Sequence, residues 1–110
     1  MATMTDRRSV AANAKVNGVF SGQLHEYVSV PAMVNVHATA SLIGLNLTVN
    51  IGGDIVLNDQ EVNAQNRLPI RPDDLLVSHA AIPGDRVVID WRNTTAGAIT
   101  GFLLVDIVPV

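Results

Sequence analysis

The chain has 110 residues, the length of one domain with a single core between two packed layers. Hydrophobic residues make up 48 % of it and charged residues 15 %, with a net charge of −3 and no cysteine. The charge argues against a binder of nucleic acid or of anionic membranes, and the lack of cysteine excludes disulfides and thiolate chemistry. The longest apolar runs are far shorter than the roughly 18–20 residues that a membrane-spanning helix needs.

The first 14 residues are predicted to form a flexible N-terminal arm, because they are small, polar and without periodicity. Their one charge cluster is Asp6-Arg7-Arg8. No apolar stretch follows these arginines, so a secretory signal is not expected and synthesis in the cytoplasm is. Residues 15–110 are predicted to form the folded domain.

Alternation of apolar and polar residues predicts strands in the first half of this domain. The clearest strand is Leu45–Ile51, which ends at Gly52-Gly53 and is followed by a returning segment that completes a hairpin. Residues 34–41 alternate in the same way. Residues 24–30 are a further strand candidate.

The second half repeats this pattern. Residues 75–82 and 86–92 are predicted strands joined by the turn Pro83-Gly84-Asp85. Residues 98–108 are apolar on both faces, which predicts a central strand covered on both sides. Residues 63–74 contain two prolines and are predicted to be a long crossing segment.

These elements predict an all-β fold of about eight strands, a single β-sandwich built as a jelly roll or a related Greek key. An immunoglobulin-like sandwich is the rival. Its Cys…Trp…Cys pattern is missing, because the chain has no cysteine.

No motif in the sequence supports catalysis or metal binding. The histidines His25, His37 and His79 lack the local spacing of zinc ligands and are interpreted as half-exposed strand residues. The segment 54–61 lacks the spacing of a calcium loop, and its aspartates are interpreted as turn residues. GxSxG and phosphate-loop motifs are absent from the sequence. We therefore expect a protein that is not an enzyme and holds no cofactor or metal.

The arginines indicate where contacts with other subunits lie. The chain has six arginines and a single lysine, and arginine is the cation favoured at protein interfaces. The outward strand positions carry Asn, Thr, Ser and Ala, which predicts sheet faces that are covered in an assembly. The predicted contact residues are Arg7, Arg8, Arg67, Arg71, Asp73 and Asp74.

Four segments, 51–54, 66–74, 83–86 and 93–97, resemble in style the small virion proteins of bacteriophages, namely decoration, cement and minor capsid proteins. The resemblance covers roughly the last two thirds of the chain. It implies a structural, non-enzymatic role in a virion and no particular site residues. The charge-poor surface predicts a homo-oligomer that contacts a major capsid protein. A trimer is favoured because trimers are common among jelly rolls, although the sequence does not choose between three and five subunits.

Two other functions stay open. A carbohydrate- or receptor-binding module would use loops at one end of the sandwich, namely Asn58–Glu61, Asn66–Asp74 and Asn93–Gly97. Aromatic residues are scarce, with only four in the chain, which weakens this interpretation because sugar-binding modules usually present aromatic side chains. Trp91 is expected in the core. A small hydrolase would need histidines or carboxylates to converge in a pocket.

Overall fold

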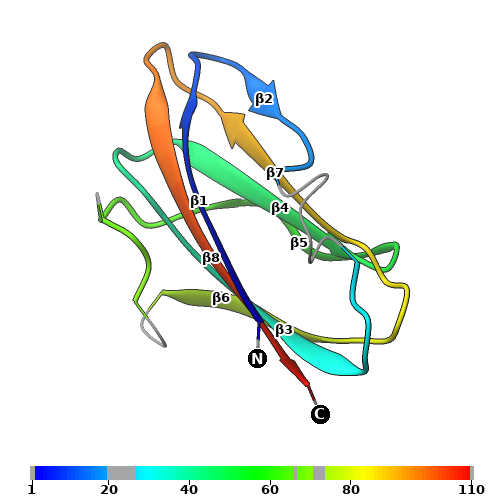
Figure 1. The fold of residues 1–110 in the computed structure, drawn as a ribbon. Coiled ribbons are helices and arrows are strands. Elements are labelled where there is room, and N and C mark those ends of the chain that lie inside the picture. Colours follow the sequence, from blue (N-terminus) through cyan, green and yellow to red (C-terminus); the bar gives the residue numbers. More distant parts are fainter. Residues whose placement is uncertain (1, 20–26, 66, 71–73, 110) are drawn as a thin grey trace.

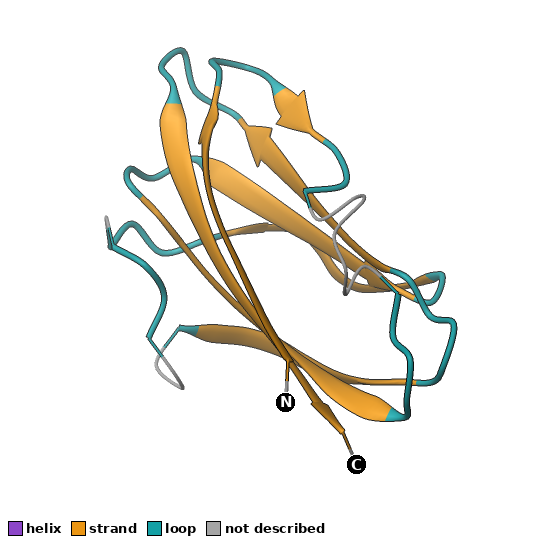
Figure 2. Cartoon of the chain, viewed as in Figure 1, coloured by secondary structure: helices purple, strands orange, loops and turns teal. Residues whose placement is uncertain are grey.

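The computed structural model describes residues 2–19, 27–65, 67–70 and 74–109. These residues form eight strands joined by loops (Figure 2). None of them belongs to a helix that is long and apolar enough to cross a membrane. The strands are β1 (Ala2–Val10), β2 (Lys15–Val16), β3 (Ala32–Ala40), β4 (Leu45–Ile51), β5 (Asp54–Glu61), β6 (Leu75–Ala81), β7 (Val87–Asn93) and β8 (Ile99–Pro109).

The strands pair as one long antiparallel hairpin that is folded on itself. β1 pairs with β8, β2 with β7, β3 with β6 and β4 with β5. Two further pairings, β3 with β8 and β4 with β7, gather the folded hairpin into two sheets. The first sheet has the order β1-β8-β3-β6 and the second sheet the order β2-β7-β4-β5 (Figure 1). This is a jelly-roll sandwich, and the predicted fold is confirmed.

The same pairing excludes the rival fold. An immunoglobulin-like sandwich contains several pairs of consecutive strands that are hydrogen-bonded neighbours. Within the described part of this chain, β4 and β5 are the one such pair. The long crossing segment is what separates β5 and β6, since it carries the chain from the second sheet to the first.

Alternation within each strand builds the core between the sheets. In β4 the residues Leu45, Leu47, Val49 and Ile51 are buried, whereas the polar residues between them are half-buried and face outward. Its neighbour β7 in the same sheet adds Val87, Ile89 and Trp91 to this inner face, and all three are buried. The expected core position of the tryptophan is therefore confirmed.

β8 lies between β1 and β3 and is the most buried strand. Its residues from Gly101 to Ile107 are all buried, on both faces of the sheet. The prediction of a central strand covered on both sides is confirmed.

The first residues differ from the expected arm. Residues 2–10 form β1, which pairs with β8 in an unbroken antiparallel register from Ala2–Ile107 to Val10–Ile99 (Figure 1). Met4 and Val10 of this strand are buried in the core. The prediction of a flexible arm over residues 1–14 is therefore wrong for residues 2–10, because these residues satisfy their backbone by pairing with a central strand whose side chains already form the core.

The first three residues of the strand candidate over residues 24–30 are outside the described residues. Its described part contributes an isolated bridge between Tyr27 and Arg86 and no longer strand.

Candidate contact surface

The outer face of the first sheet, which points away from the second sheet, is unusually well covered. Gly101 lies against the Trp91 ring of the second sheet, so the alternating residues Phe102 and Leu104 face outward. Both are nevertheless buried, as are their outward neighbours His37 and Thr39 on β3. Part of this face is therefore covered by other segments of the chain.

The crossing segment between β5 and β6 supplies that cover. The backbone N–H of Ala40 donates to the carbonyl of Asn63 at 2.9 Å, and that of Ala38 donates to the carbonyl of Asp74 at 3.3 Å. The hydroxyl of Thr39 donates to the carbonyl of Arg67. The segment thus continues the first sheet along β3, past the start of β6, and places Arg67 at the outer face.

An ion pair closes the crossing segment on itself. Nη1 of Arg67 lies 2.5 Å from Oδ2 of Asp74, and the same oxygen accepts the backbone N–H of Ile70 at 2.8 Å. Burial raises the pKa of Asp74, but the Ile70 hydrogen bond and the Arg67 guanidinium outweigh it, so the pKa lies below its ordinary value. Asp74 is therefore a charged, buried anchor for this segment.

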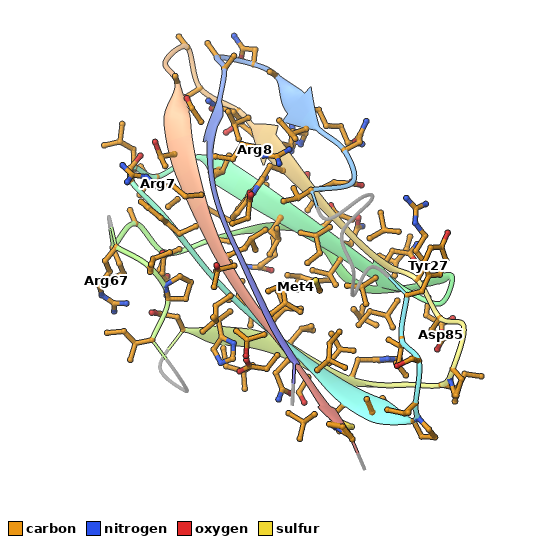
Figure 3. The ribbon with its side chains drawn as sticks, in the orientation of Figure 1. Met4, Arg7, Arg8, Tyr27, Arg67 and Asp85 are labelled. Atoms are coloured by element: carbon orange, nitrogen blue, oxygen red, sulfur yellow. The ribbon has the colours of Figure 1, made fainter. Side chains whose placement is uncertain are left out.

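A shallow pocket of about 640 Å³ opens on the outer face beside this anchor. The Arg7 guanidinium lies over the Phe102 ring, 5.6 Å from its centroid, and forms one wall of the pocket. Figure 3 shows Arg7 and Arg67 on the same side of the molecule. The residues that line this outer pocket are Thr5, Asp6, Arg7, Arg67, Leu68 and Phe102.

The outer pocket combines two guanidinium groups with an aromatic and an aliphatic side chain. Guanidinium groups bind carboxylates through paired N–H donors, and an aromatic ring under a guanidinium holds its plane in place. The pocket therefore suits a carboxylate whose neighbouring atoms are apolar, such as an acidic side chain presented by another protein.

The structure unites three of the six predicted contact residues. Arg7 is on β1, whereas Arg67 and Asp74 belong to the crossing segment before β6. Arg7 and Arg67 line the outer pocket, and Asp74 is the buried anchor beside it. Arg8 is next to Arg7 in sequence but faces the inside of the sandwich, opposite Gly101. The remaining two, Arg71 and Asp73, are outside the described residues.

The described histidines do not converge. His37 faces outward on β3, where its Nδ1 lies 3.3 Å from the carbonyl oxygen of Leu104, and it is buried. His79 pairs with Val34 on the opposite, inner face of the same sheet. The interpretation of half-exposed histidines was wrong for His37, because the crossing segment covers it, and His25 is outside the described residues. Among the described residues no three His, Asp or Glu side chains gather as a metal site would require.

The segments expected to form ligand loops lie towards one end of the sandwich, where Glu61 pairs with Asn46 and Leu45 pairs with Asn93. Asn58–Glu61 belongs to β5, where the guanidinium of Arg92 binds both carboxylate oxygens of Asp59 on the outer face of the second sheet. The described part of 66–74 lies along the first sheet near the same end, where the carbonyl of Arg67 accepts the Thr39 hydroxyl close to the end of β3. The expectation of a loop was wrong for Asn58–Glu61, because these residues belong to β5.

The third of these segments, Asn93–Gly97, uses its polar groups for hydrogen bonds within the loop and to β1. The buried Asn93 donates from Nδ2 to the carbonyls of Val10 and Gly97, at 3.0 and 2.8 Å. Its Oδ1 accepts the backbone N–H of Thr95 at 2.9 Å. Turn chemistry accounts for this loop without a ligand.

Sequence reasoning missed the large apolar side chains exposed at both ends of the sandwich. Leu42 and Ile43 are exposed at the turn between β3 and β4, where Ile43 keeps 73 % of its surface. At the other end Tyr27 and Ile82 are exposed beside Asp85, whose carbonyl accepts the N–H of Val28 (Figure 3). Large apolar residues inside predicted turns are the sequence signal that would have identified them.

No family model, no curated protein and no solved structure matches the chain.

Proposed function

We propose that the protein is a non-enzymatic structural component of a virion, as a capsid decoration, cement or minor capsid protein of a bacteriophage. It assembles with copies of itself and contacts a major capsid protein. Jelly rolls of two four-stranded sheets are a recurrent architecture of viral capsid proteins, and also of lectins and cupins. The fold is thus compatible with the proposal and by itself does not select it.

The observation that carries the proposal is the apolar character of both ends of the sandwich. Ile43 and Ile82 keep 73 % and 66 % of their surface, and Leu42 keeps 59 %. Exposed apolar side chains that gather beside one another mark surfaces that another protein covers. A lattice or stack of subunits would cover two opposite ends at once, whereas a receptor-binding tip would need one.

Light scattering of the purified chain at micromolar concentration tests self-assembly. We expect a mass that is a multiple of the chain mass. An antiserum against the purified chain should then detect it in gradient-purified phage particles. A chain that remains a monomer and is absent from such particles would contradict the proposal.

A second candidate, a carbohydrate- or receptor-binding module, is favoured by the outer pocket alone. Arg7 above Phe102, with Arg67 beside them, forms an amphipathic cavity suited to a carboxylated sugar. Calorimetric titration with an acidic and a neutral monosaccharide tests this function. Binding of the acidic sugar that is lost in Arg7→Ala would favour it over assembly, and no heat with either sugar would reject it.

A further inference from the structure

The edge strand β1 has one long side with no strand partner among the described residues. It runs for nine residues beside β8 in a register without a shift. The other sheet edges are less regular, since β2 has two residues, β6 has a register shift and β5 has shifts beside Asp59, whose φ is +52°. A long, regular edge presents backbone donors and acceptors that another strand can bind.

Side chains of β1 divide by face. Thr5, Arg7 and Ser9 point outward and are exposed or line the outer pocket. Asp6 and Arg8 point inward, where Oδ2 of Asp6 is buried without a hydrogen-bond partner and lies 3.4 Å from Nε of Arg8. An inward charge normally keeps an edge strand single, because a partner strand would bury it without a counter-charge.

The sequence of β1 can supply this counter-charge from a second copy. We propose that two copies of this chain join edge to edge through β1, antiparallel, about a two-fold axis at Arg7. The inference rests on the proposed self-assembly and specifies how the copies meet. Each inward residue then lies opposite an inward residue, so the two first sheets become one continuous sheet with a shared inner face.

The charges select this register over its neighbours. With the axis at Arg7, Asp6 lies opposite Arg8 of the partner subunit, and the reciprocal pair forms on the other side of the axis. Met4 lies opposite Val10, and Thr5 opposite Ser9, so apolar and hydroxyl side chains also match. An axis at Asp6 or at Arg8 would instead place two identical charges opposite each other, which is destabilising.

The residue on the axis is held away from its symmetry mate. The two Arg7 side chains would meet as like charges if they extended across the free edge. The Arg7 guanidinium lies over the Phe102 ring of β8, which is on the side away from that edge. Stacking on Phe102 therefore separates the two charges, and it leaves the outer pockets of the two copies on one continuous face.

Two charge reversals test the pairing by complementation between chains. Asp6→Arg places Arg opposite Arg across the axis, and Arg8→Asp places Asp opposite Asp. In sedimentation equilibrium the full chain should be a dimer or an even multimer, and either variant alone should dissociate on the order of tenfold or more readily. An equimolar mixture of the two variants should recover the association, because each mixed pair has opposite charges at both contacts.

The mixture separates contacts between chains from contacts within one. Neither variant restores the Asp6–Arg8 pair inside its own chain, so recovery in the mixture cannot come from a repaired monomer. Arg92→Asp is the matched control, because it breaks an ion pair on the outer face of the second sheet and should leave the association unchanged. Circular dichroism of each variant verifies that the strands are retained.

Each outcome decides between the two proposals. Dissociation of both single variants with recovery in the mixture supports β1 pairing. An assembly that withstands both reversals, or the trimer that a jelly-roll fold favours, overturns β1 pairing and leaves self-assembly standing. Failure of the mixture to associate also overturns β1 pairing. A monomeric full chain overturns both.

Discussion

Trp91 of β7 packs directly against Gly101 of β8 across the interior of the sandwich. A Cβ atom at residue 101 would lie 2.7 Å from Cε2 of Trp91 and 2.8 Å from Cζ2. The indole is rigid and fully buried, so it cannot yield to a methyl group. The close approach of the two sheets at this point therefore depends on glycine.

We expect Gly101→Ala to lower the free energy of unfolding by about 1–3 kcal/mol, the usual cost of overpacking a core. Urea denaturation followed by tryptophan fluorescence measures it. Gly97→Ala is the matched control, because no atom lies within 4 Å of an added Cβ there. Equal stability of the two variants would contradict the proposed packing constraint.

Residues 3–10 should be protected from amide hydrogen exchange, at least at alternate positions. The physical reason is the pairing of β1 with β8, which hydrogen-bonds every second amide of an edge strand. Mass spectrometry of exchanged, digested protein makes the measurement. Exchange over residues 3–10 as fast as over the exposed turn at Gly52-Gly53 would restore the description of this segment as an arm.

Asn93→Ala should destabilise the fold by about 1–3 kcal/mol, because it leaves the buried carbonyl group of Val10 without its side-chain donor. The loss should appear as a lower midpoint of thermal unfolding. Asn58→Ala, at an exposed position on β5, provides the control and should change stability little. A similar midpoint for both variants would show that the Asn93 contacts contribute nothing net.

Protonation of Asp74 should make the fold less stable in acid. Its pKa is below the ordinary value of 3.8 in the folded state, so its charge stabilises the fold at neutral pH. This contribution is lost as the pH falls from the unfolded pKa through the lower folded one. Asp74→Asn should cost about 1–3 kcal/mol at pH 7, since it removes the negative charge that pairs with the Arg67 guanidinium and strengthens the hydrogen bond from the Ile70 N–H.

The difference in unfolding free energy between the full chain and Asp74→Asn should therefore shrink as the pH falls below about 4. Urea titrations at several pH values measure it. Asp54→Asn, at an exposed position, should show no comparable difference. A constant gap from neutral to acidic pH would contradict a charged Asp74.

Ile43→Ser and Ile82→Ser should weaken assembly without weakening the fold. Both side chains are mostly exposed, so their replacement should change stability by about 0.5 kcal/mol or less. Light scattering should nevertheless report a smaller mass at the same concentration. The exposed polar substitution Gln60→Ser is the control for both measurements, and unchanged assembly in both isoleucine variants would argue against contacts at the ends.

Strand positions could be predicted from the sequence because burial on one face imposes a period of two. Leu45–Ile51 was predicted with the bounds that β4 has, and the predicted central strand over 98–108 corresponds to β8. The turns at Gly52-Gly53 and Pro83-Gly84-Asp85 are local, so their residues alone indicate them. The jelly roll followed from the number of strands and the long crossing segment.

β1 could not be predicted because its stability comes from a partner far along the chain. Its residues Thr3, Thr5, Arg7 and Ser9 have no apolar alternation that identifies a strand. Pairing with β8, about a hundred residues later, provides the hydrogen bonds, and the buried Met4 and Val10 fill gaps at the edge of a core made by others. A local pattern contains none of this information.

The position of the predicted contact residues could be anticipated only in part. Arg7 and Arg67 line one pocket and Asp74 is a buried anchor beside it, whereas their contact with another subunit stays a prediction. What the composition could not show is that Arg7 and Arg8, adjacent in sequence, would point to opposite faces of a strand. That assignment depended on recognising β1.

By itself the sequence determined the strand periods, the turns and the low charge of the outward positions, because each of these is a property of neighbouring residues. The tertiary structure alone decided which strands pair, that Arg7 and Arg67 line one pocket on the outer face, and that one side of β1 has no strand partner among the described residues. These relationships join residues far apart in the chain, and they arise only when a central strand, β8, acquires a neighbour on each side.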